Sequence, residues 1–196
     1  MDKIAVFGGT FNPFHNGHLQ IIQSLIKLNA FKKIIVIPTN IPPHKTSSYL
    51  ASGEDRLNMC KLALSSYTQV YISDIEILRD GPSYTYDTVC ELMKTEGDKI
   101  CLVCGGDMIS TLDTWYNYQE LIKLVDIVAF KRIGTDDEAF YRTIDKIRLA
   151  GGVVSILEDE IIDISSTEIR DNKDFNVPDV VREYIVQKRL YNVDNR

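Results

Sequence analysis

The sequence contains no apolar segment long enough to cross a bilayer and no extended run of basic residues. A transmembrane helix needs about 20 consecutive, mostly apolar residues, so we do not expect this chain to span a membrane. Its formal net charge of −6 is unfavourable for binding the polyanionic backbone of a nucleic acid. The first residues lack the pattern of a secretory signal peptide. We therefore expect a cytoplasmic protein that binds neither membrane nor nucleic acid.

Cysteine and histidine are scarce, with four and three residues. Cys101 and Cys104 form a CxxC pattern inside an apolar run that is typical of a buried strand. Alternation along a strand places their sulfurs on opposite faces, where they neither share a metal nor pair easily. We therefore interpret both as core residues. A zinc site built from His15, His18 and His44 is conceivable, but no characteristic spacing supports it, and we expect no metal held by the protein itself.

The rest of the composition is that of an ordinary globular domain. Of the 196 residues, 44% are hydrophobic and 26% are charged, and this length suits one domain over residues 1–196. Short apolar segments alternate with segments of helical periodicity, which predicts an α/β fold with a doubly wound, mainly parallel sheet and helices on both faces. The expected strands are residues 3–7, 33–37, 70–76, 99–104, 126–131 and 152–156. The expected helices are residues 16–29, 53–66, 84–96, 107–113, 116–124, 136–149, 166–172 and 178–188.

The segment from Gly8 to His18, GGTFNPFHNGH, lies between a short apolar run and an amphipathic one, which predicts a strand, a glycine turn and a helix. Gly8 and Gly9 allow close approach of backbone to a ligand, and the first helical turn offers N–H groups and a positive dipole end. Such a turn is typical of a phosphate site. It is neither a P-loop nor a GxGxxG fingerprint. Instead, His15 and His18 lie three residues apart and would donate hydrogen bonds to phosphoryl oxygens.

A second segment, Ser165 to Arg170, has the pattern of a capping box in which Ser165 caps a helix and Glu168 reaches back. The same pattern creates another helix N-terminus, surrounded by hydroxyl groups that include Ser166. Arg170, one turn further along, would present a planar guanidinium to phosphate oxygens. By itself the segment predicts either a structural cap or a second phosphate site.

GGTFNPFHNGH and SSTEIR resemble the two signatures of the HxGH nucleotidyltransferase superfamily, in the expected order and about 150 residues apart. The resemblance implies a Rossmann-like fold and transfer of a nucleoside monophosphate from a nucleoside triphosphate to a phosphate-bearing acceptor. It implies catalytic roles for His15, His18 and Arg170. The implied phosphate-binding residues are Gly8, Gly9, Thr10, Phe11, Ser165 and Ser166. Asn12 stands where many members have aspartate, so we assign it no catalytic role.

Further segments resemble one branch of this superfamily, the bacterial nicotinate-nucleotide adenylyltransferases. They are residues 41–45, residues 79–88, residues 105–108 and residues 115–116. The resemblance implies that ATP, with Mg²⁺, and nicotinate mononucleotide are the substrates. The implied products are nicotinate adenine dinucleotide (deamido-NAD) and pyrophosphate, as a step of NAD biosynthesis. Homo-oligomers occur among these enzymes, so the resemblance also admits a homo-oligomer.

The acceptor would bind at three residues of this branch. Trp115 would stack on the nicotinate ring, although a lone tryptophan can equally anchor a core. The backbone N–H groups of Thr85 and Tyr116 are the implied donors to the nicotinate carboxylate.

The nucleotide would contact a separate set of residues. Gly105 and Asp107 follow a strand, where an acid either contacts the ribose or caps the next helix. Lys45, in the proline-rich segment 38–53, is either a phosphate clamp or an ordinary surface lysine. The adenine would lie near the end of strand 126–131, beside the backbone of residues 130–133.

The expected mechanism is in-line attack of the acceptor phosphate on the α-phosphorus of ATP, with no protein nucleophile. Catalysis would then consist of positioning and of charge stabilisation. Two alternatives remain open. One is an adenylyltransferase for nicotinamide mononucleotide or another phosphorylated acceptor, because main-chain donors to a carboxylate are invisible in a sequence. The other is a nucleotide-binding sensor that does not release pyrophosphate.

Overall fold

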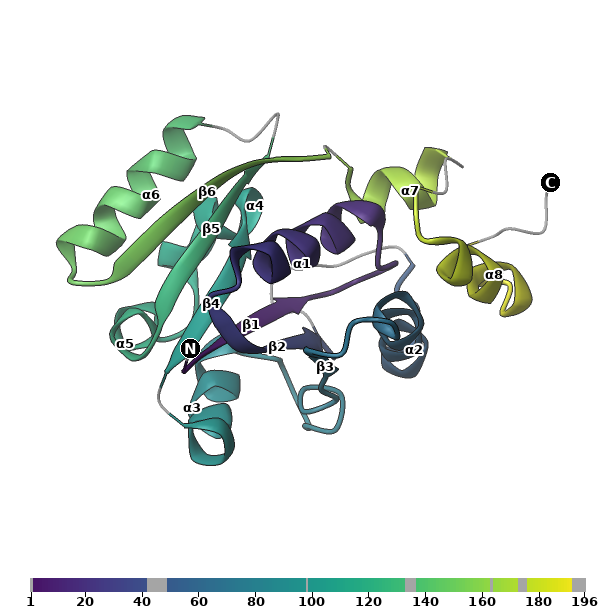
Figure 1. Cartoon of the computed structure of the whole chain (residues 1–196), viewed down its shortest axis with the longest axis horizontal. Helices are drawn as coiled ribbons and strands as arrows, with labels where there is room; N and C mark the ends of the chain where they lie inside the picture. The colour runs from purple at the N-terminus through teal and green to yellow at the C-terminus, as the bar shows by residue number, and fades with distance from the viewer. Residues whose placement is uncertain are drawn as a thin grey trace.

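A computed structural model of the chain describes residues 2–41, 49–97, 99–132, 137–162, 164–172 and 176–191. Within these residues, six strands form one sheet in the order β3-β2-β1-β4-β5-β6, and every neighbouring pair is parallel (Figure 1). The strands are β1 (Lys3–Gly9), β2 (Phe31–Pro38), β3 (Val70–Ile72), β4 (Ile100–Gly105), β5 (Asp126–Arg132) and β6 (Val153–Ile161). The helices are α1 (Asn16–Leu28), α2 (Gly53–Leu64), α3 (Thr85–Glu96), α4 (Gly106–Thr111), the 3₁₀ turn η1 (Leu112–Thr114), α5 (Tyr118–Leu124), α6 (Asp137–Leu149), α7 (Ser166–Asn172) and α8 (Asp179–Gln187).

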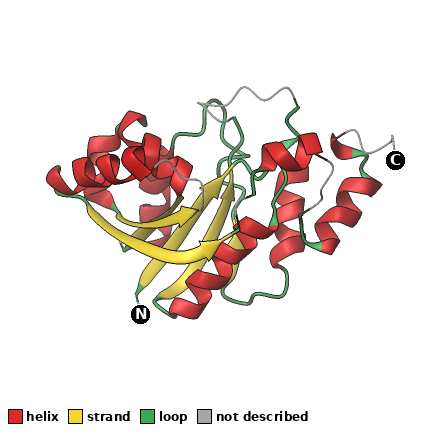
Figure 2. Cartoon of the chain, turned by 90° about the horizontal axis from the view of Figure 1, so that it is seen from above, coloured by secondary structure: helices red, strands yellow, loops and turns green. Residues whose placement is uncertain are grey.

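Helices cover both faces of the sheet, as Figures 1 and 2 show. Successive strand residues point to opposite faces, so β1 contributes Ala5 and Phe7 to one apolar cluster and Ile4 and Val6 to the other. The first cluster is closed by α1, α2 and α8, and the second by α3, α4, α5 and α6. The predicted α/β, doubly wound fold is therefore confirmed.

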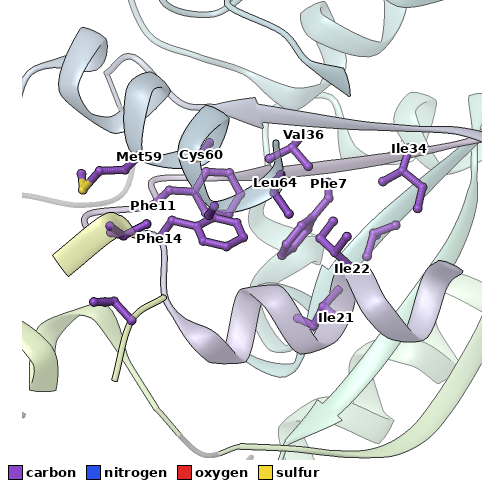
Figure 3. Packing of buried hydrophobic residues seen from close by; sticks show 14 of the residues in the cluster. Phe7, Phe11, Phe14, Ile21, Ile22, Ile34, Val36, Met59, Cys60 and Leu64 are labelled. Atoms are coloured by element: carbon purple, nitrogen blue, oxygen red, sulfur yellow. The ribbon is translucent and has the colours of Figure 1, made fainter. Parts of the chain in front are cut away.

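The first cluster includes side chains of the segment that connects β1 to α1 (Figure 3). There the rings of Phe7, Phe11 and Phe14 pack among Ile22 of α1 and Met59 of α2. All five side chains are at most 2% exposed. Such dense packing resists displacement, because filling or emptying a packed core by a methylene group already has a measurable cost. The turn between β1 and α1 is thus anchored in a closely packed core.

Two strands end four or more residues away from their predicted ends. The strand expected over 70–76 ends at Ile72, and the chain then turns, with the Leu78 N–H donating to the Asp74 carbonyl at 2.9 Å. The strand expected over 152–156 runs on to Ile161. A shift of register on β5 between Phe130 and Arg132 keeps this extension paired.

The interpretation of the CxxC pattern as core is confirmed. Cys101 belongs to the first apolar cluster and Cys104 to the second, on opposite faces of β4. Both thiols are free and buried, and burial raises the pKa of Cys101 to about 12. At neutral pH such a thiol stays protonated and is a poor nucleophile and metal ligand.

In the described part of the chain, no helix has both the length and the apolarity that a membrane crossing requires.

Candidate functional site

The site lies where the order of strands reverses, between β1 and β4. The connection after β1 leads to α1 on one face, whereas the connection after β4 leads to α4 on the other. Ligands of open α/β sheets bind at this carboxyl edge of the switch point. A cavity of about 270 Å³ occupies it. Its lining includes every predicted catalytic and phosphate-binding residue of the described chain: Gly8, Gly9, Thr10, Phe11, His15, His18, Gly105, Asp107, Ser165, Ser166 and Arg170.

A second cavity of about 160 Å³ adjoins the first. It is lined by the three residues predicted to bind the acceptor, Thr85, Trp115 and Tyr116. The two cavities share Met108 and the turn Gly8–Thr10. The glycine turn is therefore the wall between them, and the predicted nucleotide and acceptor residues lie on its two sides.

The two histidines cap α1 for each other. His15 is the N-cap residue; the His18 N–H donates to its Nδ1 at 3.4 Å, while the His15 N–H donates to Nδ1 of His18 at 3.2 Å. The rings stack with centroids 3.6 Å apart. A neutral imidazole whose Nδ1 accepts a hydrogen bond carries its proton on Nε2. This reciprocal cap thus sets the same tautomer in both residues, a consequence that the spacing alone did not reveal.

Phe11 and Gly9 support this pair. Phe11 has a φ of 48°, in the left-handed region, and its ring lies 4.9 Å from that of His18 in an edge-on arrangement. A Cβ on Gly9 would lie 2.9 Å from the Phe11 ring, so only glycine fits there without rearrangement. A Cβ on Gly8 would meet no atom within 4 Å, because Gly8 faces open space. The Phe11 side chain is core, and what it offers a ligand is its backbone.

The segment Ser165–Arg170 forms the predicted capping box. The Ser165 N–H donates to Glu168 Oε2 at 2.8 Å, and the Glu168 N–H donates to Ser165 Oγ at 3.1 Å. This end of α7 is also hydrogen-bonded to the part of the glycine turn that follows Gly8–Thr10. Arg170 Nη1 donates to the Asn12 carbonyl at 2.7 Å, and Ser166 Oγ to the Pro13 carbonyl at 3.0 Å. The segment therefore both caps α7 and lines the first cavity.

In the second cavity, Trp115 also combines two roles. It is partly buried against the apolar cluster of the α3–α6 face, yet it lines the cavity. Thr85 is the first residue of α3, whose N-cap, Tyr84, makes no capping hydrogen bond through its side chain. N–H groups at a helix start have no partner within the helix. The start of α3 thus lies at this cavity, where the prediction for Thr85 requires a backbone donor.

Sequence reasoning missed Glu76, which lines the second cavity and is 5% exposed. Thr88 Oγ1 donates to Glu76 Oε1 at 2.8 Å, and the side chains of Ser83 and Thr39 also hydrogen-bond to this carboxyl group. Burial raises the pKa of Glu76, and these hydroxyl groups partly oppose that shift. The acid follows Ile75 and precedes Ile77, so its only sequence signal was a carboxylate inside an apolar run.

The remaining predictions divide between described and undescribed residues. Asp107 lies in the first turn of α4 and lines the first cavity; the N-cap is Gly105, which has no side chain, so Asp107 is not the capping residue. Lys45, His44 and Ile133 lie outside the described residues. Among the residues that the structure describes, no three His, Cys, Asp or Glu side chains are grouped as metal ligands.

Comparison with known proteins identifies the family. Residues 6–172 match the cytidylyltransferase-like family. The "Probable nicotinate-nucleotide adenylyltransferase" of Fusobacterium nucleatum is 41% identical over 180 residues, covering 91% of this chain and 90% of that protein. The nicotinate-nucleotide adenylyltransferase of Bacillus subtilis is 34% identical over 198 residues, covering 97% and 99%.

The solved structures agree in fold. The nicotinic acid mononucleotide adenylyltransferase of Plasmodium falciparum, complexed with NaAD, superposes with a TM-score of 0.81 and covers 98% of each chain at 18% identity. At this identity the likeness establishes the arrangement of strands and helices alone. The family match and the two relatives lead to one conclusion: the chain belongs to the cytidylyltransferase-like family and, within it, to the nicotinate-nucleotide adenylyltransferases.

Proposed function

We propose that the protein transfers AMP from ATP to nicotinate mononucleotide, giving deamido-NAD and pyrophosphate, as a single domain over residues 1–196. The observation that carries this proposal is the pair of cavities that meet at Gly8–Thr10. A direct reaction between two phosphate-bearing substrates needs two sites that meet at the reacting phosphates, and the residues shared by the two cavities mark that junction. The names and near-complete coverage of the relatives support the same activity.

The first cavity would hold ATP. His15 and His18 would donate from Nε2 to oxygens of the transferring phosphoryl group, and the backbone of Gly8, Gly9, Thr10 and Phe11 would surround the phosphates. At the opposite wall, Ser165, Ser166 and Arg170 would bind the pyrophosphate portion. Gly105 and Asp107 would contact the ribose, and Lys45 is a candidate phosphate clamp.

The second cavity would hold nicotinate mononucleotide. Trp115 would stack on the ring, and the N–H groups of Thr85 and Tyr116 would bind its carboxylate. Nicotinamide mononucleotide is the second candidate, because Glu76 could accept a hydrogen bond from an amide. We favour nicotinate, since Thr88, Ser83 and Thr39 already hydrogen-bond to the Glu76 carboxyl group.

In the reaction, a phosphate oxygen of the acceptor forms a bond to the α-phosphorus, and the bond from that phosphorus to the bridging oxygen breaks. The electron pair leaves with pyrophosphate, and no bond to the protein forms. The chain contributes orientation and hydrogen bonds to charge as it develops.

Mg²⁺ fits this site as an ion carried by the nucleotide. It prefers oxygen ligands and retains several waters, so phosphates can supply most of its coordination. Among the described residues that line the first cavity, Asp107 is the one carboxylate. When bound, the ion would neutralise phosphate charge.

The test is pyrophosphate release with ATP and Mg²⁺, comparing nicotinate mononucleotide and nicotinamide mononucleotide side by side. We expect a strong preference for the nicotinate substrate. Equal or reversed preference would contradict the assignment of the second cavity while leaving the transfer chemistry in place. ATP binding without release from either acceptor would support the sensor instead.

A further inference from the structure

Arg56, on α2, is among the largest fully buried side chains of the described chain, at 1% exposed. Its guanidinium donates to backbone carbonyl groups: Nε to Ala51 at 3.0 Å, Nη1 to Thr10 at 2.9 Å and also to Thr39, and Nη2 to Asn40 at 3.1 Å. Thr10 belongs to the glycine turn, Thr39 and Asn40 follow β2, and Ala51 precedes α2. One buried cation therefore joins three separate segments at the carboxyl edge of the sheet.

A buried guanidinium is costly unless its donors are satisfied, because leaving water penalises the charged form. Burial accordingly lowers the pKa of Arg56. An apolar side chain of similar volume could fill the same space without that penalty. What an apolar side chain lacks is a rigid, planar fork of N–H donors that fixes several carbonyls at once. A buried arginine at this position therefore indicates that these carbonyl groups must be fixed relative to one another, which an apolar core residue could not do.

The geometry that Arg56 holds is that of the wall between the two cavities. Thr10 lines both of them. Ala51 is held from a second side as well, because its N–H donates to Asn12 Oδ1 at 3.1 Å. The glycine turn and the ends of the two neighbouring segments are therefore bound into one unit, in which Arg56 makes four of the connections.

We propose that Arg56 is a positioning residue of the transfer reaction, acting through the backbone of Thr10. This inference rests on the proposed function. Arg56 lines neither cavity, so it can affect the reaction only through the carbonyl groups that it holds. Of these residues, Thr39 lines the second cavity alone, and Thr10 belongs to the turn Gly8–Thr10, which lines both. A shift of that turn would change the distance and angle between the acceptor phosphate and the α-phosphorus while leaving the other binding groups in place.

The consequence is a split between kcat and KM. Misplacement of reacting groups by about 1 Å can cost on the order of 10²-fold in rate. We therefore expect Arg56→Lys and Arg56→Ala to lower kcat by roughly 10²-fold, with KM for each substrate changing by no more than about threefold. Millimolar guanidinium chloride should restore part of the kcat of Arg56→Ala, and sodium chloride at the same concentration should not.

Two control variants separate positioning from stability. Arg148→Lys makes the same substitution at a residue that lines neither cavity, where Arg148 Nη2 donates to the Val154 carbonyl at 3.1 Å. Ile147→Ala removes a buried side chain of α6 and should lower Tm substantially. Both should retain the wild-type kcat when assayed well below their Tm, whereas the Arg56 variants should not.

Several outcomes would overturn the proposal: a wild-type kcat in folded Arg56 variants, a loss no larger than that of Ile147→Ala, or failure of both Arg56 variants to fold. The last result would assign Arg56 to stability alone. Lack of pyrophosphate release by the wild-type protein is a different result. It would reject the proposed function itself and is recognised before any variant is measured.

Discussion

At the scale of single residues, His15 and His18 combine an observed helix cap with the catalytic role proposed for them. Each Nδ1 accepts a backbone N–H of the other residue, so each Nε2 carries the proton in the neutral state. The cap therefore aligns the donors before a ligand arrives. A preorganised donor of this kind is worth more than one that must reorient during the reaction.

Because Nδ1 of His18 caps the helix and Nε2 is the proposed donor, two substitutions at His18 should have opposite effects. Asparagine places an oxygen near the position of Nδ1 and has no group at Nε2, whereas glutamine places an amide nitrogen near Nε2. We expect His18→Asn to retain Tm and to lose about 10²–10³-fold in kcat. His18→Gln should have a lower Tm and a smaller loss of kcat. Thermal unfolding and steady-state kinetics measure both; parallel losses of Tm and kcat in the two variants would contradict the argument.

Burial disfavours the charged form of Glu76, so the contribution of this residue to stability should depend on pH. Burial raises its pKa above the ordinary value of 4.5, so the folded state holds the proton more tightly than the unfolded state. Stability from this group is fully present below the unfolded pKa and is lost as pH rises through the folded pKa. We expect the Tm advantage of wild type over Glu76→Gln to shrink as pH rises from about 4 to 7.

Thr88→Val is the matched variant for this measurement. The Thr88 hydroxyl lowers the Glu76 pKa by hydrogen bonding, so its removal should extend the decline in stability to higher pH. A Tm difference between wild type and Glu76→Gln that grows with pH would show that Glu76 titrates in the opposite sense.

At the scale of elements, strands and helices that follow a regular sequence pattern could be predicted. Departures that depend on tertiary contacts could not. The run Ile34–Ile37 is buried throughout, and β2 was predicted because a strand covered on both faces is continuously apolar. Residues 73–76, which were expected to continue the third strand, turn away from the sheet after β3. Nothing in the pattern indicates that the Ser73 N–H donates the last bond to β2, at the Val36 carbonyl.

The site followed the same rule. The glycine turn, the histidines and Ser165–Arg170 could be predicted because local motifs carry them. Arg56 and Glu76 could not, because their roles depend on carbonyl and hydroxyl groups from segments distant in the sequence. Neither a charged residue on an amphipathic helix nor an acid between isoleucines has a local signature.

At the scale of the whole molecule, the C-terminal segment returns to the glycine turn. In Figure 1, α8 lies beside α2, and Tyr184 Oη donates to Asp55 Oδ1 at 2.9 Å between these helices. Beyond α8, Tyr191 Oη donates to Asn12 Oδ1 at 2.8 Å. The side chain of Asn12 therefore connects the glycine turn to the segment at Ala51 and to the end of the described chain.

This long-range contact yields the last prediction, for Tyr191→Phe. The hydroxyl group is buried and its hydrogen bond spans 179 positions in the sequence, so removing it should lower the free energy of unfolding by about 0.5–1.5 kcal/mol. The control is Tyr67→Phe, because Tyr67 Oη accepts from Gln23 Nε2 at an exposed position and should contribute little. Urea denaturation measures both. In a double-mutant cycle, Tyr191→Phe should be nearly silent in an Asn12→Ala background. Full additivity there would mean that Tyr191 stabilises the protein through its ring against Tyr49, and that the glycine turn is not held from the C-terminal end of the fold.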